Sequence, residues 1–298
     1  MTQSASEQAW TIGKLLEWTT KHLAQKACGS PRLDADVLLA HVLDCQRIDL
    51  YGMRHNEIAG EDIKKQYREL IRQRLDGCPV AYLVGHKEFF SLDFLVTPDV
   101  LIPRPDSEIV VMECLKRLKE MNSARVLDLG TGSGNLAITI AKRAPSAEVT
   151  SVDISEKALD VANLNTAKHD VDVRFLHGDL FSPLDKGETF DIIISNPPYI
   201  PNADISSLSV DVRDYEPHLA LDGGPDGFAV FDRIITDAST YLKDGGILLL
   251  EIGSPQEEPA RARISRLAQY ELAPTLFDFA RQPRALLATY HACTRELP

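Results

Sequence analysis

The chain has 298 residues, of which 44% are hydrophobic and 26% charged, a balance typical of globular proteins and not of disordered ones. No apolar run approaches the roughly 20 residues of a membrane-spanning helix, so we expect no membrane association. The net charge is −12, and since residues 1–85 hold 11 basic and 11 acidic side chains, the excess acid lies in residues 86–298. This argues against nucleic acid as the main substrate, because nucleic-acid-binding domains usually have a basic face; it fits a basic protein partner or serves solubility alone.

The five cysteines are scattered without a C-x-x-C pair, which indicates free thiols in a reducing cytosol. The first ten residues lack the basic and apolar regions of a signal peptide, so we expect a cytoplasmic protein. The eight histidines show no metal-ligand spacing, and we expect no metal site.

Residues 8–75 are predicted to be mainly helical. An apolar face at helical spacing runs from Ile12 to Leu23, and amphipathic helices are expected over 33–43 and 61–75. Residues 86–102 alternate loosely between apolar and polar side chains, as in a β-hairpin. We therefore expect a helical bundle over 1–85, a hairpin linker over 86–103 and a second domain over 104–298.

From residue 125 the pattern alternates between strands and helices. Strands are expected over 126–129, 148–154, 172–180, 190–196 and 245–252, with helices over 135–143, 156–168, 229–242 and 259–270. Such alternation predicts an α/β fold, with a parallel sheet covered by helices on both faces.

A glycine-rich turn follows the first of these strands. It reads Gly130-Thr131-Gly132-Ser133-Gly134, and Asp153 closes the next strand 19 residues later. Glycines let a ligand lie against the backbone, and an acidic residue at that distance can bind both hydroxyls of a ribose. The turn lacks the dinucleotide spacing and the chain has no phosphate loop, so we expect a nucleoside-like ligand without a pyrophosphate. A purely structural turn is the alternative reading.

S-adenosylmethionine meets this description, with S-adenosylhomocysteine as its product. Asp128, just before the glycines, is positioned to accept from the ammonium group of the ligand. Asp179 ends the third strand and is expected to meet the adenine amino group, with Leu180 or Phe181 packing on the ring.

The fourth strand ends in Ser195-Asn196-Pro197-Pro198-Tyr199. Two prolines stop a strand because neither has an N–H to donate. Asn196 can accept one N–H of a planar NH₂ group with its side-chain carbonyl, and the Pro197 backbone carbonyl can accept the other. The prolines hold that carbonyl in place, and Tyr199 can lie flat on the planar group. The alternative reading is an ordinary turn.

These four residues, Asn196 to Tyr199, resemble the (N/D)PP(Y/F) signature of methyltransferases that act on planar nitrogens. Residues 85–108, 126–138, 195–200, 211–227 and 248–253 resemble the HemK/PrmC family, which methylates the glutamine N5 in the Gly-Gly-Gln loop of class I peptide-chain release factors. The resemblance implies a Rossmann-like class I methyltransferase domain behind an N-terminal helical domain that docks the release factor. It also carries the cofactor contacts onto Gly130–Gly134, Asp153 and Asn196, and the substrate contacts onto Asn196–Tyr199.

Three other functions remain open at this point. The same chemistry could act on a glutamine of a ribosomal protein, or on adenine N6 of nucleic acid, because all of these nitrogens are planar. A scaffold that binds without turnover is the third, and the intact Asn196–Tyr199 motif argues against it. Arg104, between two prolines, is expected either to reach the cofactor tail or to clamp the hairpin.

Overall fold

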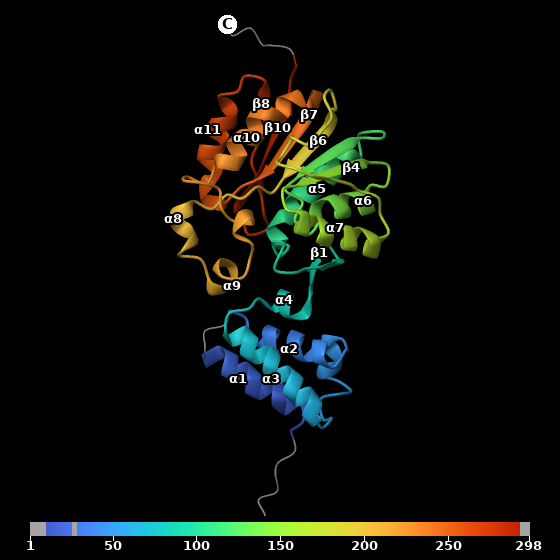
Figure 1. Cartoon of the computed structure of the whole chain (residues 1–298), viewed down its shortest axis with the longest axis vertical. Helices are drawn as coiled ribbons and strands as arrows, with labels where there is room; N and C mark the ends of the chain where they lie inside the picture. The colour runs from blue at the N-terminus through green and yellow to red at the C-terminus, as the bar shows by residue number, and fades with distance from the viewer. Residues whose placement is uncertain (1–9, 26–28, 293–298) are drawn as a thin grey trace, which may run out of the picture. The chain divides into compact units, whose positions relative to one another are not determined.

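The computed structural model describes residues 10–25 and 29–292. The chain divides into two compact units. One comprises Met1–Gly85 with Val210–Tyr215, and the other His86–Ser209 with Glu216–Pro298 (Figure 1).

The first unit is a bundle of the helices α1 (Ile12–Gln25), α2 (Pro31–Val42), α3 (Glu61–Leu75) and the short α4 (Val80–Val84). α2 starts two residues before the expected position because Pro31 has its φ preset for the first helical turn. α4, which periodicity does not show, ends at Gly85 with a φ of 79°. The unit has its own core, which includes Ile12, Leu16, Leu23, Leu38, Leu39, Leu50 and Tyr67.

A segment from much later in the chain completes this unit. It contains α9 (Val210–Arg213), and the hydroxyl of Tyr215 donates to the carbonyl of Asp76 at 3.1 Å. A Cβ on Gly77 would lie 2.5 Å from Val210 Cγ1, so the two segments pack closely at this point. From the sequence alone, residues 210–215 are expected in the second domain. Their local pattern does not indicate a contact with residues near Asp76.

The second unit is built on a mixed sheet with the strand order β5-β4-β3-β6-β7-β10-β8. β3 (Arg125–Leu129), β4 (Glu148–Asp153), β5 (Arg174–His177), β6 (Phe190–Ser195) and β7 (Leu242–Glu251) are parallel. β10 (Pro283–Tyr290) runs antiparallel to β7 and to β8 (Tyr270–Leu272), and β9 (Leu276–Phe277) also pairs with β10. The chain order reverses at β3, so ligands are expected at the carboxyl ends of the strands beside it.

Helices cover both faces of the sheet, as the alternating pattern predicts. α5 (Glu108–Leu118), α6 (Asn135–Arg143) and α7 (Glu156–His169) lie on one face, and α10 (Ala229–Asp237) and α11 (Glu257–Ser265) on the other (Figure 1). α10 and α11 each end five residues before the expected position, and α11 also begins two residues earlier. They end early because Leu242 already pairs with Phe190 in the sheet and Tyr270 with Tyr290.

The expected hairpin is present as β1 (His86–Phe89) and β2 (Leu92–Leu95). Its two turn residues, Phe90 and Ser91, have φ values of 51° and 59°, as a two-residue hairpin turn requires. The buried amide of Asn165 on α7 binds both backbone groups of Leu95, at 2.7 and 2.9 Å, and donates to Ser133 O at 2.9 Å. The hairpin is therefore fastened to the sheet unit, and to the glycine turn in particular.

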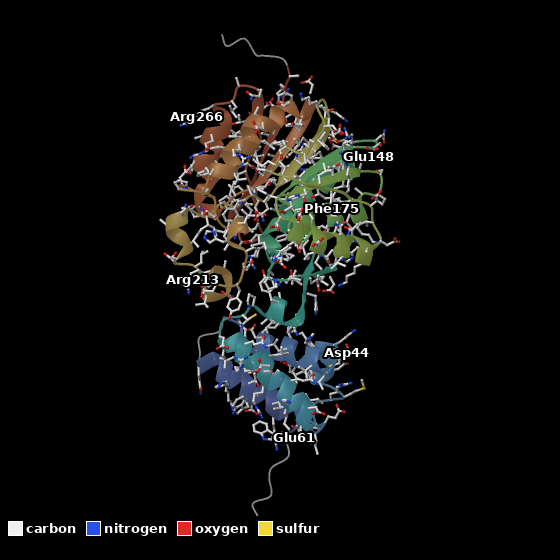
Figure 2. All side chains as sticks on the ribbon, in the orientation of Figure 1. Asp44, Glu61, Glu148, Phe175, Arg213 and Arg266 are labelled. Atoms are coloured by element: carbon white, nitrogen blue, oxygen red, sulfur yellow. The ribbon has the colours of Figure 1, made fainter. Side chains whose placement is uncertain are left out.

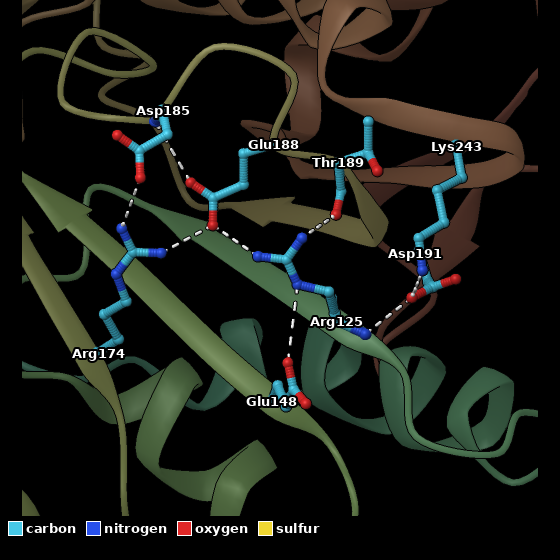
Figure 3. A network of polar contacts seen from close by, with 8 residues as sticks. All are labelled: Arg125, Glu148, Arg174, Asp185, Glu188, Thr189, Asp191 and Lys243. Atoms are coloured by element: carbon cyan, nitrogen blue, oxygen red, sulfur yellow. Dashed lines mark hydrogen bonds and ion pairs between the residues drawn. The ribbon is translucent and has the colours of Figure 1, made fainter.

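A polar network joins the amino ends of the parallel strands (Figure 3). Glu188 accepts from the guanidinium groups of Arg125 and Arg174, at 2.5 and 2.7 Å. Asp191 accepts from the Arg125 backbone and from Lys243, both at 2.7 Å. Glu148, labelled in Figure 2, begins β4 at this end. These contacts fix the amino ends of the strands. The site can therefore form at the opposite end of the sheet, where the strands have their carboxyl ends.

Candidate active site

A cavity of about 380 Å³ opens at the carboxyl ends of β3, β4 and β6, within the size range of small-molecule sites. Of the residues singled out in the sequence, Gly130, Gly132, Asp153, Asp179, Leu180, Asn196, Pro197 and Pro198 line it. Asp128, Thr131, Ser133, Gly134 and Tyr199 do not. Residues up to 68 positions apart in sequence thus meet at one site, where the topology predicts it.

The glycine turn forms the floor of the cavity. Gly130, Gly132 and Gly134 have φ values of 77°, 55° and 82°, a region that other residues rarely adopt. A Cβ on Gly132 would meet no atom within 4 Å, whereas one on Gly134 would lie 2.7 Å from Ile138 Cδ1. Gly134 is therefore needed for packing against α6, and Gly132 leaves room on the cavity side. Thr131 and Ser133 are buried behind the turn.

Asp153 is held rigidly at the end of β4. One carboxylate oxygen accepts from the Gly132 N–H at 2.8 Å and the other from the Ser155 N–H at 2.9 Å. Burial raises the pKa of this carboxyl, and the backbone donors oppose the rise. Each oxygen keeps a lone pair for a further donor, so the side chain can accept from the two hydroxyls of a ribose.

Asp128 lies fully buried behind the glycine turn. Its Oδ2 accepts from the Ser151 hydroxyl at 2.9 Å. Burial raises the pKa of the Asp128 carboxyl to about 6; the hydroxyls of Ser151 and Thr131 oppose this, and the nearby Asp153 charge adds to it. Asp128 therefore contributes negative charge behind the cavity floor without lining the cavity.

Asp179 and Leu180 form one wall. Asp179 is exposed and pairs with Arg233 at 2.8 Å, so its carboxylate is already engaged. Leu180 has a φ of 50° and lines the cavity. Phe181, the other residue considered for ring packing, stacks on Tyr241 with ring centroids 4.9 Å apart. Leu180 is thus the one of this pair that can meet a ligand.

Asn196 directly follows β6. Its Nδ2 donates to the buried Ser107 hydroxyl at 3.1 Å, which leaves the carbonyl Oδ1 as the free end of the amide. Ser195, beside it, donates to the Leu129 carbonyl at 2.7 Å and ties β6 to β3. An acceptor held at this edge, in the same cavity as Asp153, can bind an N–H of a planar substrate group.

Tyr199 is fixed at its backbone. Gln256 Nε2 donates to the backbone carbonyl of Tyr199 at 2.9 Å, and Oε1 of the same Gln256 side chain accepts from the Gly253 N–H at 3.1 Å. A Cβ on Gly227 would lie 2.4 Å from that same Tyr199 carbonyl, so the loop after α9 packs against the motif. Burial raises the pKa of the Tyr199 hydroxyl to about 12.

Two segments that sequence reasoning did not assign also line the cavity: residues 98–101, and Pro217, Leu219, Ala220 and Asp222. The buried Glu216 joins them, since it accepts from the Ile102 N–H at 3.1 Å and pairs with Arg104. Arg104 therefore clamps the segment after the hairpin. The only sequence signal for these two segments is that residues 85–108 and 211–227 resemble the family. That resemblance does not indicate which of their residues contact the cavity.

The charge of the cavity favours a cation. Its lining residues include four aspartates, Asp99, Asp153, Asp179 and Asp222, and one arginine, Arg233. Arg233 pairs with Asp179 and Lys157 pairs with Asp99, so the excess negative charge comes from Asp153 and Asp222. Lining of this kind repels phosphate and attracts a positively charged ligand. Together with the apolar walls, Val100, Leu101 and Leu129 among them, it fits a nucleoside that carries a sulfonium and an ammonium group.

Comparison with known proteins identifies the family. Residues 14–85 match the model of the PrmC N-terminal domain, and residues 109–211 match the methyltransferase small domain. A release factor glutamine methyltransferase of Rhodopirellula baltica is 44% identical over 258 residues, which cover 85% of this chain and 87% of that protein. The chain belongs to the release factor glutamine methyltransferase family.

A second family member, from Geobacter sulfurreducens, is 42% identical over 87% of this chain and 90% of its own. A solved methyltransferase structure from Pyrococcus furiosus is 20% identical, covers 76% of this chain and 98% of its own, and has a TM-score of 0.50. This likeness and the strand order give the second unit the Rossmann-like fold of class I methyltransferases, as predicted. The family expected from the sequence motifs is confirmed.

Proposed function

We propose that this enzyme transfers a methyl group from S-adenosylmethionine to the side-chain amide nitrogen of the glutamine in the Gly-Gly-Gln loop of class I release factors. The observation that carries the proposal is the meeting of Asn196 and Asp153 in one acidic cavity, in a chain of this family. When bound, the cofactor supplies an electrophilic methyl group on its sulfonium. Asp153 would hold its ribose, with Gly130 and Gly132 beneath it.

The chemical difficulty lies in the substrate. An amide nitrogen is a poor nucleophile because its lone pair is delocalised into the carbonyl. Asn196 Oδ1 and the Pro197 carbonyl would accept its two N–H groups, which aligns the nitrogen and stabilises positive charge that develops on it. No strong base is needed beforehand, since the nitrogen becomes acidic as it is methylated and sheds its proton afterwards.

Pro198 and Tyr199 would serve the same end. Pro198 stiffens the segment that carries the Pro197 carbonyl, and Gln256 holds the carbonyl of Tyr199, two residues further on. The backbone acceptor is therefore preorganised and costs little to reorganise during the reaction. Stacking of the Tyr199 ring on the substrate amide stays a prediction.

The helical unit would dock the release factor. Within this unit a groove of about 800 Å³ is lined by apolar side chains, including Trp10 and Trp18, which are 40% and 51% exposed. Trp18 stacks on His22 and meets Trp10 edge-on, and exposed aromatic rings of this kind often anchor protein partners. Lys65 and Arg68 add positive charge to the same groove.

Translation termination takes place in the cytoplasm, and we propose that location for the enzyme. Within residues 10–25 and 29–292, no helix has the length and apolar character needed to cross a membrane. The acidic excess in residues 86–298 agrees with a protein substrate more than with nucleic acid. A ribosomal-protein glutamine or an adenine N6 remains an outcome that a substrate panel would detect.

Asn196→Ala tests the catalytic part of the proposal. Losing one preorganised polar contact should lower turnover by roughly 10²–10³-fold, while calorimetric affinity for S-adenosylmethionine changes much less. Asn196→Asp is the matched variant, because it keeps Oδ1 but loses the N–H that binds Ser107. Near-normal turnover by Asn196→Ala would sink the proposed mechanism.

A further inference from the structure

The orientation of the Asn196 amide decides what the substrate meets. An asparagine side chain presents a carbonyl on one side and an NH₂ group on the other, and only the carbonyl can accept an N–H. In the structure Nδ2 donates to Ser107 Oγ at 3.1 Å, so the carbonyl is left for the substrate. Whatever fixes this orientation must accept from Nδ2 and must not donate to Oδ1.

Ser107 can meet that requirement, because its hydroxyl oxygen accepts from Asn196 and its single proton can be directed elsewhere. It ends η2 (Pro105–Ser107), where the chain enters α5, and is 2% exposed. Its hydroxyl lies beside the carboxyl of Glu251 and lowers the pKa of that group. Glu251 is the last residue of β7, and the pairing of Leu250 with Ser195 places it level with Asn196. A serine hydroxyl has one proton and two lone pairs, so a proton given to Glu251 leaves only lone pairs for Asn196.

Glu251 is suited to hold that proton. It is fully buried, and among the described residues its Oε2 has no hydrogen-bond partner. A buried carboxylate this poorly solvated accepts strongly from the nearest hydroxyl. A Ser107 proton directed at Glu251 would set the direction of the chain Asn196–Ser107–Glu251 from its buried end.

We propose that Ser107 and Glu251 are positioning residues of the methyl transfer: Glu251 orients the Ser107 hydroxyl, which in turn holds the Asn196 amide with its carbonyl toward the substrate nitrogen. The inference rests on the proposed function and goes beyond it. Neither residue needs to touch substrate or cofactor. Their effect passes through Asn196, so it disappears when Asn196 is absent.

The same arrangement makes turnover depend on pH. Burial raises the pKa of Glu251 to about 7; Asp106 adds to the rise, and Ser107, Arg284 and Arg104 oppose it. Tyr199 also faces this carboxyl and stays neutral in this range. Once protonated, Glu251 can donate to Ser107, whose proton is then free to turn toward Asn196 and favour the flipped amide. Turnover should therefore rise as the pH rises through about 7.

The test is a double-mutant cycle in the full-length enzyme, with purified release factor and labelled S-adenosylmethionine. Ser107→Ala should lower kcat about tenfold, the scale of one hydrogen bond, with KM for both substrates nearly unchanged. In the Asn196→Ala background the same change should cost nothing more. Ser107→Thr should restore most of the rate, and Glu251→Gln should lose the pH dependence near 7.

Thr139→Val is the control, because it removes another buried hydroxyl, one that donates to the Asn135 carbonyl within α6 and lies outside the cavity. Melting temperatures check that each variant is folded. An unchanged kcat in Ser107→Ala, or the same tenfold loss with and without Asn196, would overturn the positioning role while leaving the proposed function intact. Wild-type enzyme that methylates no release factor would overturn both.

Discussion

The buried carboxylate of Asp128 should destabilise the folded protein, and replacing it with a neutral side chain should show by how much. Burial raises the pKa of this carboxyl from 3.8 to about 6, which corresponds to roughly 3 kcal/mol of destabilisation when it is charged. The folded state holds this proton more tightly than the unfolded state, so stability falls as the pH rises from about 4 through 6. Above that window the full cost is present.

Asp128→Asn removes the charge and keeps the shape. Its carbonyl can still accept from Ser151, and its NH₂ group can donate to the Thr131 hydroxyl. The free energy of unfolding should therefore rise by up to about 3 kcal/mol at pH 8 and by about half as much at pH 5. Urea denaturation of both proteins at the two pH values measures this difference.

Asp191→Asn is the matched control. Asp191 accepts hydrogen bonds from Lys243 and from the Arg125 backbone at one oxygen (Figure 3), so neutralising it should lower stability at pH 8. Equal gains for Asp128→Asn at both pH values, or a loss at pH 8, would refute the charge argument. We expect the negative charge of Asp128 to attract the cationic cofactor. Asp128→Asn should therefore also bind S-adenosylmethionine about tenfold more weakly by calorimetry, which is roughly 1.4 kcal/mol.

Three further substitutions separate the parts of the site. Asp153→Ala should weaken cofactor binding, and unchanged calorimetric affinity would remove this residue from the ribose role. Gly132→Ala should reduce cofactor affinity at a cost of about 1 kcal/mol in stability, whereas Gly134→Ala, which meets Ile138 at 2.7 Å, should lose clearly more stability; equal losses in a melting assay would contradict this distinction. Trp18→Ala should raise KM for release factor without changing cofactor affinity, and an unaffected KM would exclude the groove as its docking site.

Much of the fold could be predicted because its strands and helices follow from local sequence patterns. The β-branched run before Asn196 and the glycine turn after Leu129 each mark a strand that ends at the same sheet edge. Helix ends were less predictable, because only sheet pairing shows that Leu242 and Tyr270 belong to strands. The placement of residues 210–215 in the helical unit depends on a contact 139 residues away along the chain.

The site residues also fall into those that local sequence patterns predict and those that they do not. Asp153 and Asn196 could be assigned because strand ends and their polar residues are local features. Ser107, Glu216 and Glu251 could not, since each acts through a partner on another element, 89 residues away for Ser107 and 114 for Glu216. Asp128 and Tyr199 were assigned direct contacts, and the structure places both outside the cavity lining, because side-chain burial is not visible in a motif.

The most direct measurement is transfer of a labelled methyl group from S-adenosylmethionine. Purified release factor, its Gly-Gly-Gln variant with the glutamine changed to alanine, ribosomal proteins and unmethylated DNA would be offered in parallel. We expect label on the release factor and none on the alanine variant, which fixes substrate and atom together. Label on DNA or a ribosomal protein, with release factor unlabelled, would contradict the proposed substrate.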